Sequence, residues 1–182
     1  CRQLRGAAPR HKTWDLGFSS DGKRLVTCGS DGCVVLYNTE DGAELARIDA
    51  WDEVVVQACT MSPCGKFIAA GGADGFVKVW DCTGETPVQI MEEKLHEVKT
   101  VRRKRFSVSR VAFSRDSSCI ASAGHDGKVT VWSLSEKKSV VEYSLPSSSR
   151  SNGMLHVEFS QQDGVNKAIA CGDNGTVVIL DL

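Results

Sequence analysis

The sequence predicts an all-β protein, a β-propeller, and three observations support that fold class. An Asp-Gly or Asn-Gly dipeptide recurs four times in 182 residues, in the segments SDGCVVLY, ADGFVKVW, HDGKVTVW and DNGTVVIL. The copies are 43, 52 and 48 residues apart, and repeats of roughly 40 to 45 residues with four strands each are typical of propeller blades. Each copy follows a strand, a turn and a second strand, as in FSSDGKRLVTCG. We therefore expect four antiparallel four-stranded blades.

The first strand of each expected blade carries apolar residues at alternate positions. Alternation with a period of two is the pattern of a strand that buries one face. We expect these residues to line the inner part of the blades. The pairs are Leu16 and Phe18, Cys59 and Met61, Val111 and Phe113, and Val157 and Phe159.

A tight turn joins the second and third strands of every blade. Asp-Gly and Asn-Gly tolerate the positive φ angles of a two-residue hairpin, so the flanking strands are expected to be antiparallel neighbours. Alternate apolar residues of the third strand share one face, which we expect to pack on the neighbouring blade at about 10 Å. The outermost strand has the weakest signal and is expected near 43–48, 87–91 and 139–144. The third-strand pairs are Val34 and Leu36, Val77 and Val79, Val129 and Val131, and Val177 and Ile179.

The segments FSSDGKRLVTCGSDGCVVLY and FSRDSSCIASAGHDGKVTVW resemble repeats of the WD-repeat family, and the resemblance covers nearly the whole chain. Blades of that family often share a hydrogen-bonded set of Trp, Ser, Asp and His. The third repeat keeps Trp132, Ser122 and Asp126, but no repeat has the usual Gly-His before its first strand. These departures favour softer outer blades. The resemblance implies structural roles in the other repeats for Thr27, Asp31 and Tyr37, for Asp74 and Trp80, and for Asn174.

The number of repeats indicates part of a ring. Propellers of the WD-repeat family generally close with about six to eight blades, and a ring of four would require each blade to turn about a quarter-circle from its neighbour. We therefore expect a larger ring, completed by the rest of a parent chain or by another chain. The expected blades are residues 11–50, 51–92, 106–146 and 152–182, with an insertion at 92–106.

The composition is that of an ordinary soluble globular domain, with 41% hydrophobic and 25% charged residues. A net charge of −1 argues against a protein that coats nucleic acid through bulk charge. No apolar run reaches the 18 or more residues of a membrane span, so we expect no membrane insertion. The eight cysteines contain no CxxC pair. Reduced structural cysteines are therefore expected, which indicates a cytoplasmic or nuclear location.

The motifs of common enzyme classes are absent from the sequence. It contains no glycine-rich phosphate loop with Lys and Ser or Thr, no HExxH and no nucleophile elbow. The four histidines, at positions 11, 96, 125 and 156, lack the spacing of metal ligands. We therefore expect no catalytic residue, no metal site and no cofactor.

Two tryptophans lie where the chain passes from an outer strand to the next inner strand. These are Trp14 and Trp51, the latter followed by Asp52. The resemblance implies that such connections are exposed on the face most used for binding partners, and Trp is enriched among interface hot spots. Both tryptophans and Asp52 are therefore candidate partner contacts. The alternative is that each ring packs beneath its own loop.

The insertion between the second and third repeats divides by charge. Its acidic residues Glu92, Glu93 and Glu97 precede a dense basic cluster. That cluster is a candidate contact for an acidic protein surface, RNA phosphates or an import receptor, and it places Ser107 where a basophilic kinase would act. The alternative is a solvated loop. The basic residues are Lys99, Arg102, Arg103, Lys104 and Arg105.

These observations predict a nonenzymatic scaffold, a WD-repeat propeller subunit or domain that displays loops to other proteins of a larger assembly. The first alternative is an RNA-binding propeller of a ribonucleoprotein, which would hold phosphates with the basic residues of segment 99–105. The third reading is a propeller fused to an enzyme that lies outside this chain.

Overall fold

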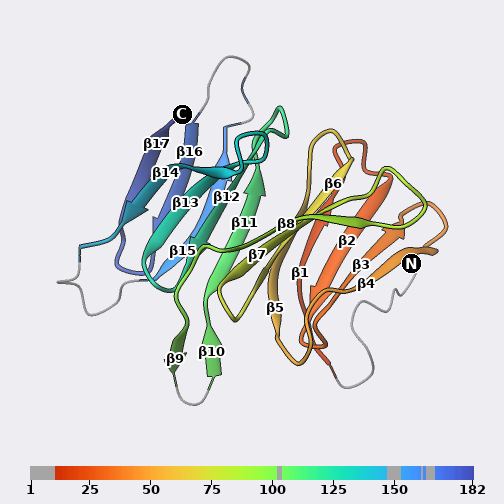
Figure 1. Cartoon of the computed structure of the whole chain (residues 1–182), viewed down its shortest axis with the longest axis horizontal. Coiled ribbons are helices and arrows are strands. Elements are labelled where there is room, and N and C mark those ends of the chain that lie inside the picture. Colours follow the sequence, from red (N-terminus) through yellow and green to blue (C-terminus); the bar gives the residue numbers. More distant parts are fainter. Residues whose placement is uncertain (1–10, 102–103, 147–152, 161, 163–166) are drawn as a thin grey trace.

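The computed structural model describes residues 11–101, 104–146, 153–160, 162 and 167–182, and every regular element in these residues is a β-strand. The strands form a row of antiparallel sheets, which we number as blades 1 to 4, and a separate hairpin (Figure 1). This arrangement confirms the predicted all-β propeller fold. Blade 1 contains β1 (Thr13–Phe18), β2 (Arg24–Gly29), β3 (Cys33–Asn38) and β4 (Glu44–Asp49).

Each blade is a meander in which sequential strands are antiparallel neighbours, as the turn signals predict. Blades 1 to 3 have the expected four strands, whereas blade 4 has three in the described part of the chain. Blade 2 contains β5 (Val56–Met61), β6 (Phe67–Gly72), β7 (Phe76–Asp81) and β8 (Val88–Lys94). Blade 3 contains β11 (Val108–Phe113), β12 (Cys119–Gly124), β13 (Lys128–Ser133) and β14 (Lys138–Ser144). Blade 4 contains β15 (Met154–Phe159), β16 (Lys167–Gly172) and β17 (Val177–Asp181).

The core lies between the blades. Val26, Val34 and Leu36 of blade 1 pack with Cys59 and Met61 of blade 2, and all five side chains are buried. Equivalent apolar clusters join blade 2 to blade 3 and blade 3 to blade 4. In each case second- and third-strand residues of one blade share the cluster with first-strand residues of the next. We call these surfaces the trailing face and the leading face of a blade.

The first-strand expectation is correct in three blades and wrong in blade 1. Phe113 is 4% exposed in blade 3, but Phe18, at the same register position in blade 1, is 58% exposed and Leu16 is 51% exposed. The alternating pattern identifies an apolar face but not what covers it. Among the described residues no blade precedes blade 1, so its leading face meets solvent.

The trailing face of blade 4 is open for the same reason. Val34, Val77 and Val129 are fully buried, whereas their counterpart Val177 is 67% exposed and Ile179 is 59% exposed. The described chain therefore presents one uncovered apolar face at each end of the row, as expected of part of a ring.

A polar link crosses the innermost strands. The Arg110 guanidinium of β11 lies 3.0 Å and 2.9 Å from the two carboxylate oxygens of Asp15 in β1, and 3.4 Å from Glu158 of β15. The backbone N–H of Cys59 in β5 donates to the same Asp15 carboxylate at 3.1 Å. One arginine and one aspartate thus connect all four blades.

No helix that could span a membrane is found in the residues described.

The two phenylalanines provide a test of the fold, because they share residue type and register but not burial. We predict that Phe113→Ala lowers the free energy of unfolding by about 3 to 5 kcal/mol, since it empties a packed interface. Phe18→Ala should change it by about 0.5 kcal/mol or less, since its ring is largely exposed. Urea unfolding of both variants measures the difference, and equal losses would show that blade 1 is covered in solution.

Candidate partner-binding surface

The tight turns and the connections between blades meet at the same end of each sheet. The carbonyl of Gly32 accepts the backbone N–H groups of Ala50 and Trp51 at 3.2 Å and 3.1 Å. The carbonyl of Gly75 accepts those of Leu95 and His96 in the same way. Both glycines have positive φ, 78° and 94°, which turns the carbonyl toward the connection. These hydrogen bonds identify the same position in both connections. Most of the candidate residues lie at this end of the blades.

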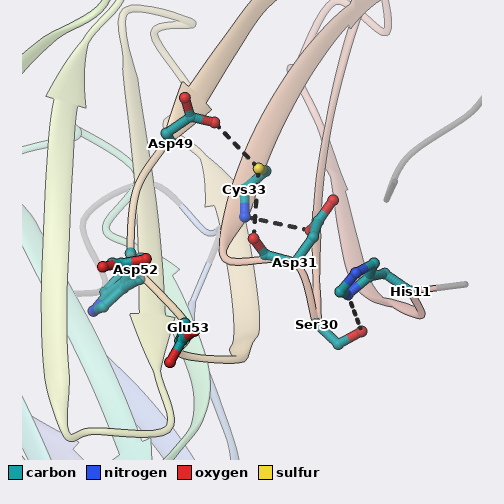
Figure 2. Close-up of a pocket in the computed structure, with 8 residues that line it drawn as sticks. His11, Ser30, Asp31, Cys33, Asp49, Asp52 and Glu53 are labelled. Atoms are coloured by element: carbon teal, nitrogen blue, oxygen red, sulfur yellow. Dashed lines mark hydrogen bonds between the residues drawn. The ribbon is translucent and has the colours of Figure 1, made fainter. Parts of the chain in front are cut away.

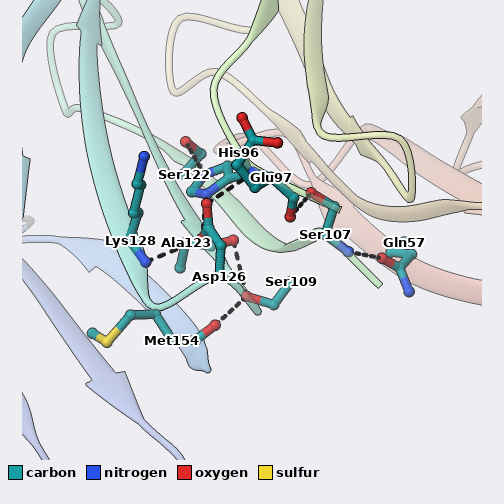
Figure 3. A network of polar contacts seen from close by, with 10 residues as sticks. All are labelled: Gln57, His96, Glu97, Ser107, Ser109, Ser122, Ala123, Asp126, Lys128 and Met154. Carbon is teal, nitrogen blue, oxygen red and sulfur yellow. Dashed lines mark hydrogen bonds and ion pairs between the residues drawn. The ribbon is translucent and has the colours of Figure 1, made fainter. Parts of the chain in front are cut away.

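In blade 3 this position is occupied by His96, which the sequence pattern missed. Its Nε2 lies 2.8 Å from Ser122 Oγ and its Nδ1 lies 3.0 Å from Asp126 Oδ1 (Figure 3). The imidazole is fully buried. His96 therefore completes the polar set of the third repeat, although Leu95 replaces the usual Gly and the insertion separates His96 from β11. A sequence search that allowed the histidine of the polar set to lie at a variable distance before the first strand would have found His96.

Asp126 connects the turn, the histidine and the insertion. Its Oδ1 also accepts the N–H of Lys128 at 3.1 Å, and its Oδ2 accepts the N–H of Glu97 at 2.9 Å. Burial alone would raise the pKa of this carboxyl, but the bond and the charge of His96, together with these backbone donors, leave the pKa below its ordinary value. The carboxylate therefore stays ionised and is a strong acceptor.

In blade 2 the equivalent position is occupied by Trp51, which corrects the expectation of a surface contact. The ring is 8% exposed, belongs to the core cluster between blades 1 and 2, and packs edge-on against Trp80 with the centroids 6.1 Å apart. Its Nε1–H donates to Asp74 Oδ2 at 2.9 Å. Lys78 Nζ lies 4.6 Å from the ring centroid, close enough for a cation–π contact. Trp51 thus supplies the donor that His96 supplies in blade 3.

The other residues for which the resemblance implies structural roles lie in or beside the blades. Thr27, Tyr37 and Trp80 are buried, and Trp132 packs partly buried against the cluster between blades 2 and 3. In the turns, side-chain oxygens accept backbone N–H groups two residues later: Asp31 from Cys33 at 3.3 Å, and Asn174 from Thr176 at 3.0 Å.

Asp52 is exposed beside a cavity of about 570 Å³ on the blade 1 side of the connection (Figure 2). Burial, helped by the neighbouring Asp49, raises the pKa of Cys33, so its thiol stays protonated and donates to Asp49 at 3.4 Å. Four carboxylates around one cavity disfavour phosphate and favour a cationic side chain. The described residues contain no group suited to hold a metal ion. The cavity is lined by His11, Ser30, Asp31, Cys33, Asp49, Trp51, Asp52 and Glu53.

Trp14 is the exposed tryptophan of the expected pair, at 49% in β1. It lies at a bulge, because the β1–β2 register shifts between Thr13 and Asp15. The same shift occurs at the start of the first strand in all four blades. The structure does not bring Trp14 together with Trp51, whose ring is in the core.

The basic cluster lies on a hairpin of β9 (Lys99–Val101) and β10 (Lys104–Phe106), which projects beyond the blades (Figure 1). Arg102 and Arg103 lie outside the described residues. The hairpin root is closed, because Ser107 Oγ donates to the Glu97 carbonyl at 3.1 Å. Ser107 is fully buried, which corrects the suggestion that a kinase reaches it in the folded chain.

Trp51 provides a test of this surface. We predict that Trp51→Ala lowers the free energy of unfolding by about 3 to 5 kcal/mol, as for a buried aromatic ring. Trp51→Phe keeps a ring but leaves Asp74 without the indole donor, and should cost about 1 to 3 kcal/mol. Trp14→Ala is the exposed control and should cost less than about 1 kcal/mol. Denaturant melts give all three values, and similar losses in the two alanine variants would contradict the buried role of Trp51.

A family model described as "Nucleolar protein 10-like, N-terminal domain", a β-propeller, matches residues 8–181. Among curated proteins, human transducin beta-like protein 2 is 32% identical over 124 residues, which are 65% of this chain and 26% of that protein. The probable cytosolic iron-sulfur protein assembly protein CIAO1 homolog of Caenorhabditis elegans is 28% identical over 137 residues, 66% of this chain and 39% of that protein. The chain thus spans well under half the length of these relatives.

The small ribosomal subunit protein RACK1y of Oryza sativa subsp. japonica is 25% identical over 120 residues, 66% of this chain and 34% of that protein. Among solved structures, the β-propeller domain of Cps50 (Swd1) from Myceliophteria thermophila superposes with a TM-score of 0.73 at 12% identity. That superposition covers 98% of this chain and 58% of the other, and it shows the shared fold. The chain therefore belongs to the nucleolar protein 10-like N-terminal domain family and is a WD-repeat β-propeller.

Proposed function

We propose that this chain is a nonenzymatic scaffold, a propeller segment that binds other proteins within a larger assembly. The observation that carries the proposal is the pair of uncovered apolar blade faces. Phe18 and Leu16 lie at one end of the row, and Val177 and Ile179 lie at the other. Each side chain is more than half exposed, whereas its counterparts at the interfaces inside the row are buried. Contiguous exposed apolar surface marks interaction sites in soluble proteins.

The two faces are complementary in kind. Every interface inside the row joins a trailing face to a leading face, and the uncovered pair consists of one of each. The natural complement is therefore further propeller blades, from a parent chain or from another chain. Because the row of four blades covers 58% of the Cps50 propeller, the complement would amount to about three blades.

The names of the relatives support a place in macromolecular assemblies. The nematode relative is named for iron-sulfur protein assembly, and the rice relative for the small ribosomal subunit. The description of the family model names a nucleolar protein. Because the family description names a nucleolar protein and the nematode relative is named cytosolic, the proposed location stays the predicted one, cytoplasmic or nuclear.

We propose three groups of partner contacts. They are the exposed Trp14, Asp52 at the acidic cavity, and the basic hairpin with Lys99, Arg102, Arg103, Lys104 and Arg105. The acidic cavity favours protein over RNA, because carboxylates repel phosphates. The alternative function is RNA binding through the basic hairpin. A propeller fused to an enzyme outside this chain remains the third prediction.

Light scattering tests the proposal. At tens of micromolar the chain should self-associate through its open faces or capture its missing blades when they are co-expressed. The double variant Phe18→Asp with Val177→Asp should remain folded and monomeric, because both side chains are largely exposed. The matched variant Val77→Asp should unfold, because it buries a charge at an internal interface. The proposal would be contradicted if the unmodified chain scattered light as a single monomeric species, melted cooperatively and captured no blades.

A further inference from the structure

The turn that joins β16 to β17, at one end of the row, carries an amide where the equivalent turns of blades 1 to 3 carry a carboxylate (Figure 1). Its central dipeptide is Asn174-Gly175, and the other three are Asp-Gly. A backbone nitrogen that follows an Asn can attack the side-chain amide carbon and close a succinimide ring. A following Gly has no Cβ to obstruct this approach. The turn of blade 4 therefore contains both groups of an intramolecular reaction.

This turn is open to water. Asn174 and Gly175 are both exposed, and a Cβ placed on Gly175 would have no atom of the described structure within 4 Å, apart from those of its chain neighbours. A Cβ on Gly32 would lie 2.2 Å from the carbonyl oxygen of Trp51, because the connection to blade 2 covers that turn. Gly75 is covered in the same way by the connection to blade 3. Water and hydroxide therefore reach the Gly175 N–H, which must lose its proton before the nitrogen attacks.

Two hydrogen bonds define the starting geometry of the two groups. Thr176 N–H donates to Asn174 Oδ1 at 3.0 Å, which holds the side-chain amide beside the Gly175 peptide and makes its carbonyl carbon more electrophilic. Gly175 N–H donates to the Gly172 carbonyl at 3.2 Å, at the long end of the usual range, and this bond must open before the nitrogen attacks. Opening is favoured in blade 4, where Val177 is 67% exposed, because a segment held by few apolar contacts opens locally at low cost.

We propose that Asn174 is a site of deamidation, a modification that the folded chain carries out on itself with water as the co-reactant. The Gly175 nitrogen loses its proton and bonds to Asn174 Cγ, the Cγ–Nδ2 bond breaks, and the side-chain nitrogen leaves as ammonia. Water then adds to one of the two carbonyl carbons of the succinimide, and the bond from that carbon to the ring nitrogen breaks. One water is consumed and one ammonia is released, so the reaction needs no oxidant or reductant.

The two products of ring opening have different consequences for blade 4. Opening at Cγ leaves an aspartate at position 174, which matches the other turns, where Asp31 accepts the N–H of Cys33 two residues later. The turn is then kept and gains a negative charge. Opening at the backbone carbonyl leaves an isoaspartate, whose main chain runs through Cγ and is one atom longer. A two-residue hairpin with Gly175 at a φ of 81° does not accommodate the extra atom, so this product loosens the turn beside the open trailing face.

Mass spectrometry of the whole folded chain tests the proposal. The chain is incubated in mildly alkaline buffer made with heavy-oxygen water and is then digested with trypsin in ordinary water. A deamidated peptide that carries the heavy oxygen reacted before digestion, while the chain was folded. Trypsin cuts after Lys167, so Asn174 lies on the peptide of residues 168–182, and the other Asn-Gly pair, at 152–153, lies on a different peptide.

Asn38 is the matched control within the same chain. Its Oδ1 accepts the N–H of Glu40, two residues later, at 2.8 Å, as Asn174 accepts that of Thr176, but the residue after Asn38 is Thr39 instead of Gly. We expect Asn174 to react at least about tenfold faster than Asn38. The variant Asn174→Gln would need a larger ring and should stay unmodified at position 174.

Two results would overturn the proposal. Equal rates at Asn174 and Asn38 in the folded chain would show that the open Asn-Gly turn has no special reactivity. A chain that reacts at Asn174 when it is unfolded in urea, but not when it is folded, would show that the turn protects the amide. Neither result depends on the light-scattering behaviour of the open blade faces, so the modification site and the scaffold role are judged separately.

Discussion

The structure depends on close apolar packing between the trailing face of one blade and the leading face of the next. Third-strand valines such as Val77 are fully buried there. The approach is so close at Gly71 that a Cβ on that residue would lie 2.3 Å from a methyl carbon of Val108. Directional bonds add to this packing, but the apolar contact decides how closely the blades approach. For the same reason, each of the two end faces is an exposed apolar surface that can associate with a neighbouring blade.

Local signals made most of the fold predictable from the sequence. Asp-Gly and Asn-Gly fix the turn, since Gly32 and Gly127 adopt φ of 78° and 87°, and the period of two fixes which residues share a face. What covers that face is not local information, and for this reason Leu16 and Phe18 were misplaced. The role of His96 was not predicted for a related reason. It bonds to residues 26 and 30 positions away, and the hairpin separates it in sequence from blade 3.

The equivalent position in three connections shows how one geometric role accepts different chemistry. His96 and Trp51 both direct a ring nitrogen toward the aspartate of a tight turn, although only His96 also reaches a hydroxyl. In the connection to blade 4, Leu145 N–H bonds to the Gly127 carbonyl, and the next residue is Pro146, which has no N–H to add a second bond. The polar set is therefore complete in blade 3, reduced in blade 2 and weaker toward blade 4, while the apolar interfaces persist throughout.

The position of the insertion explains how the blade tolerates it. The hairpin begins at Lys99, three residues after His96, which is anchored on Ser122 and Asp126. It ends at Phe106, directly before Ser107, whose backbone and hydroxyl are all engaged. The extra chain therefore leaves and re-enters the blade between two fixed points, and the register of β11 is unaffected. Because Asp126 binds both His96 and the N–H of Glu97, the start of the insertion is hydrogen-bonded to the turn of blade 3.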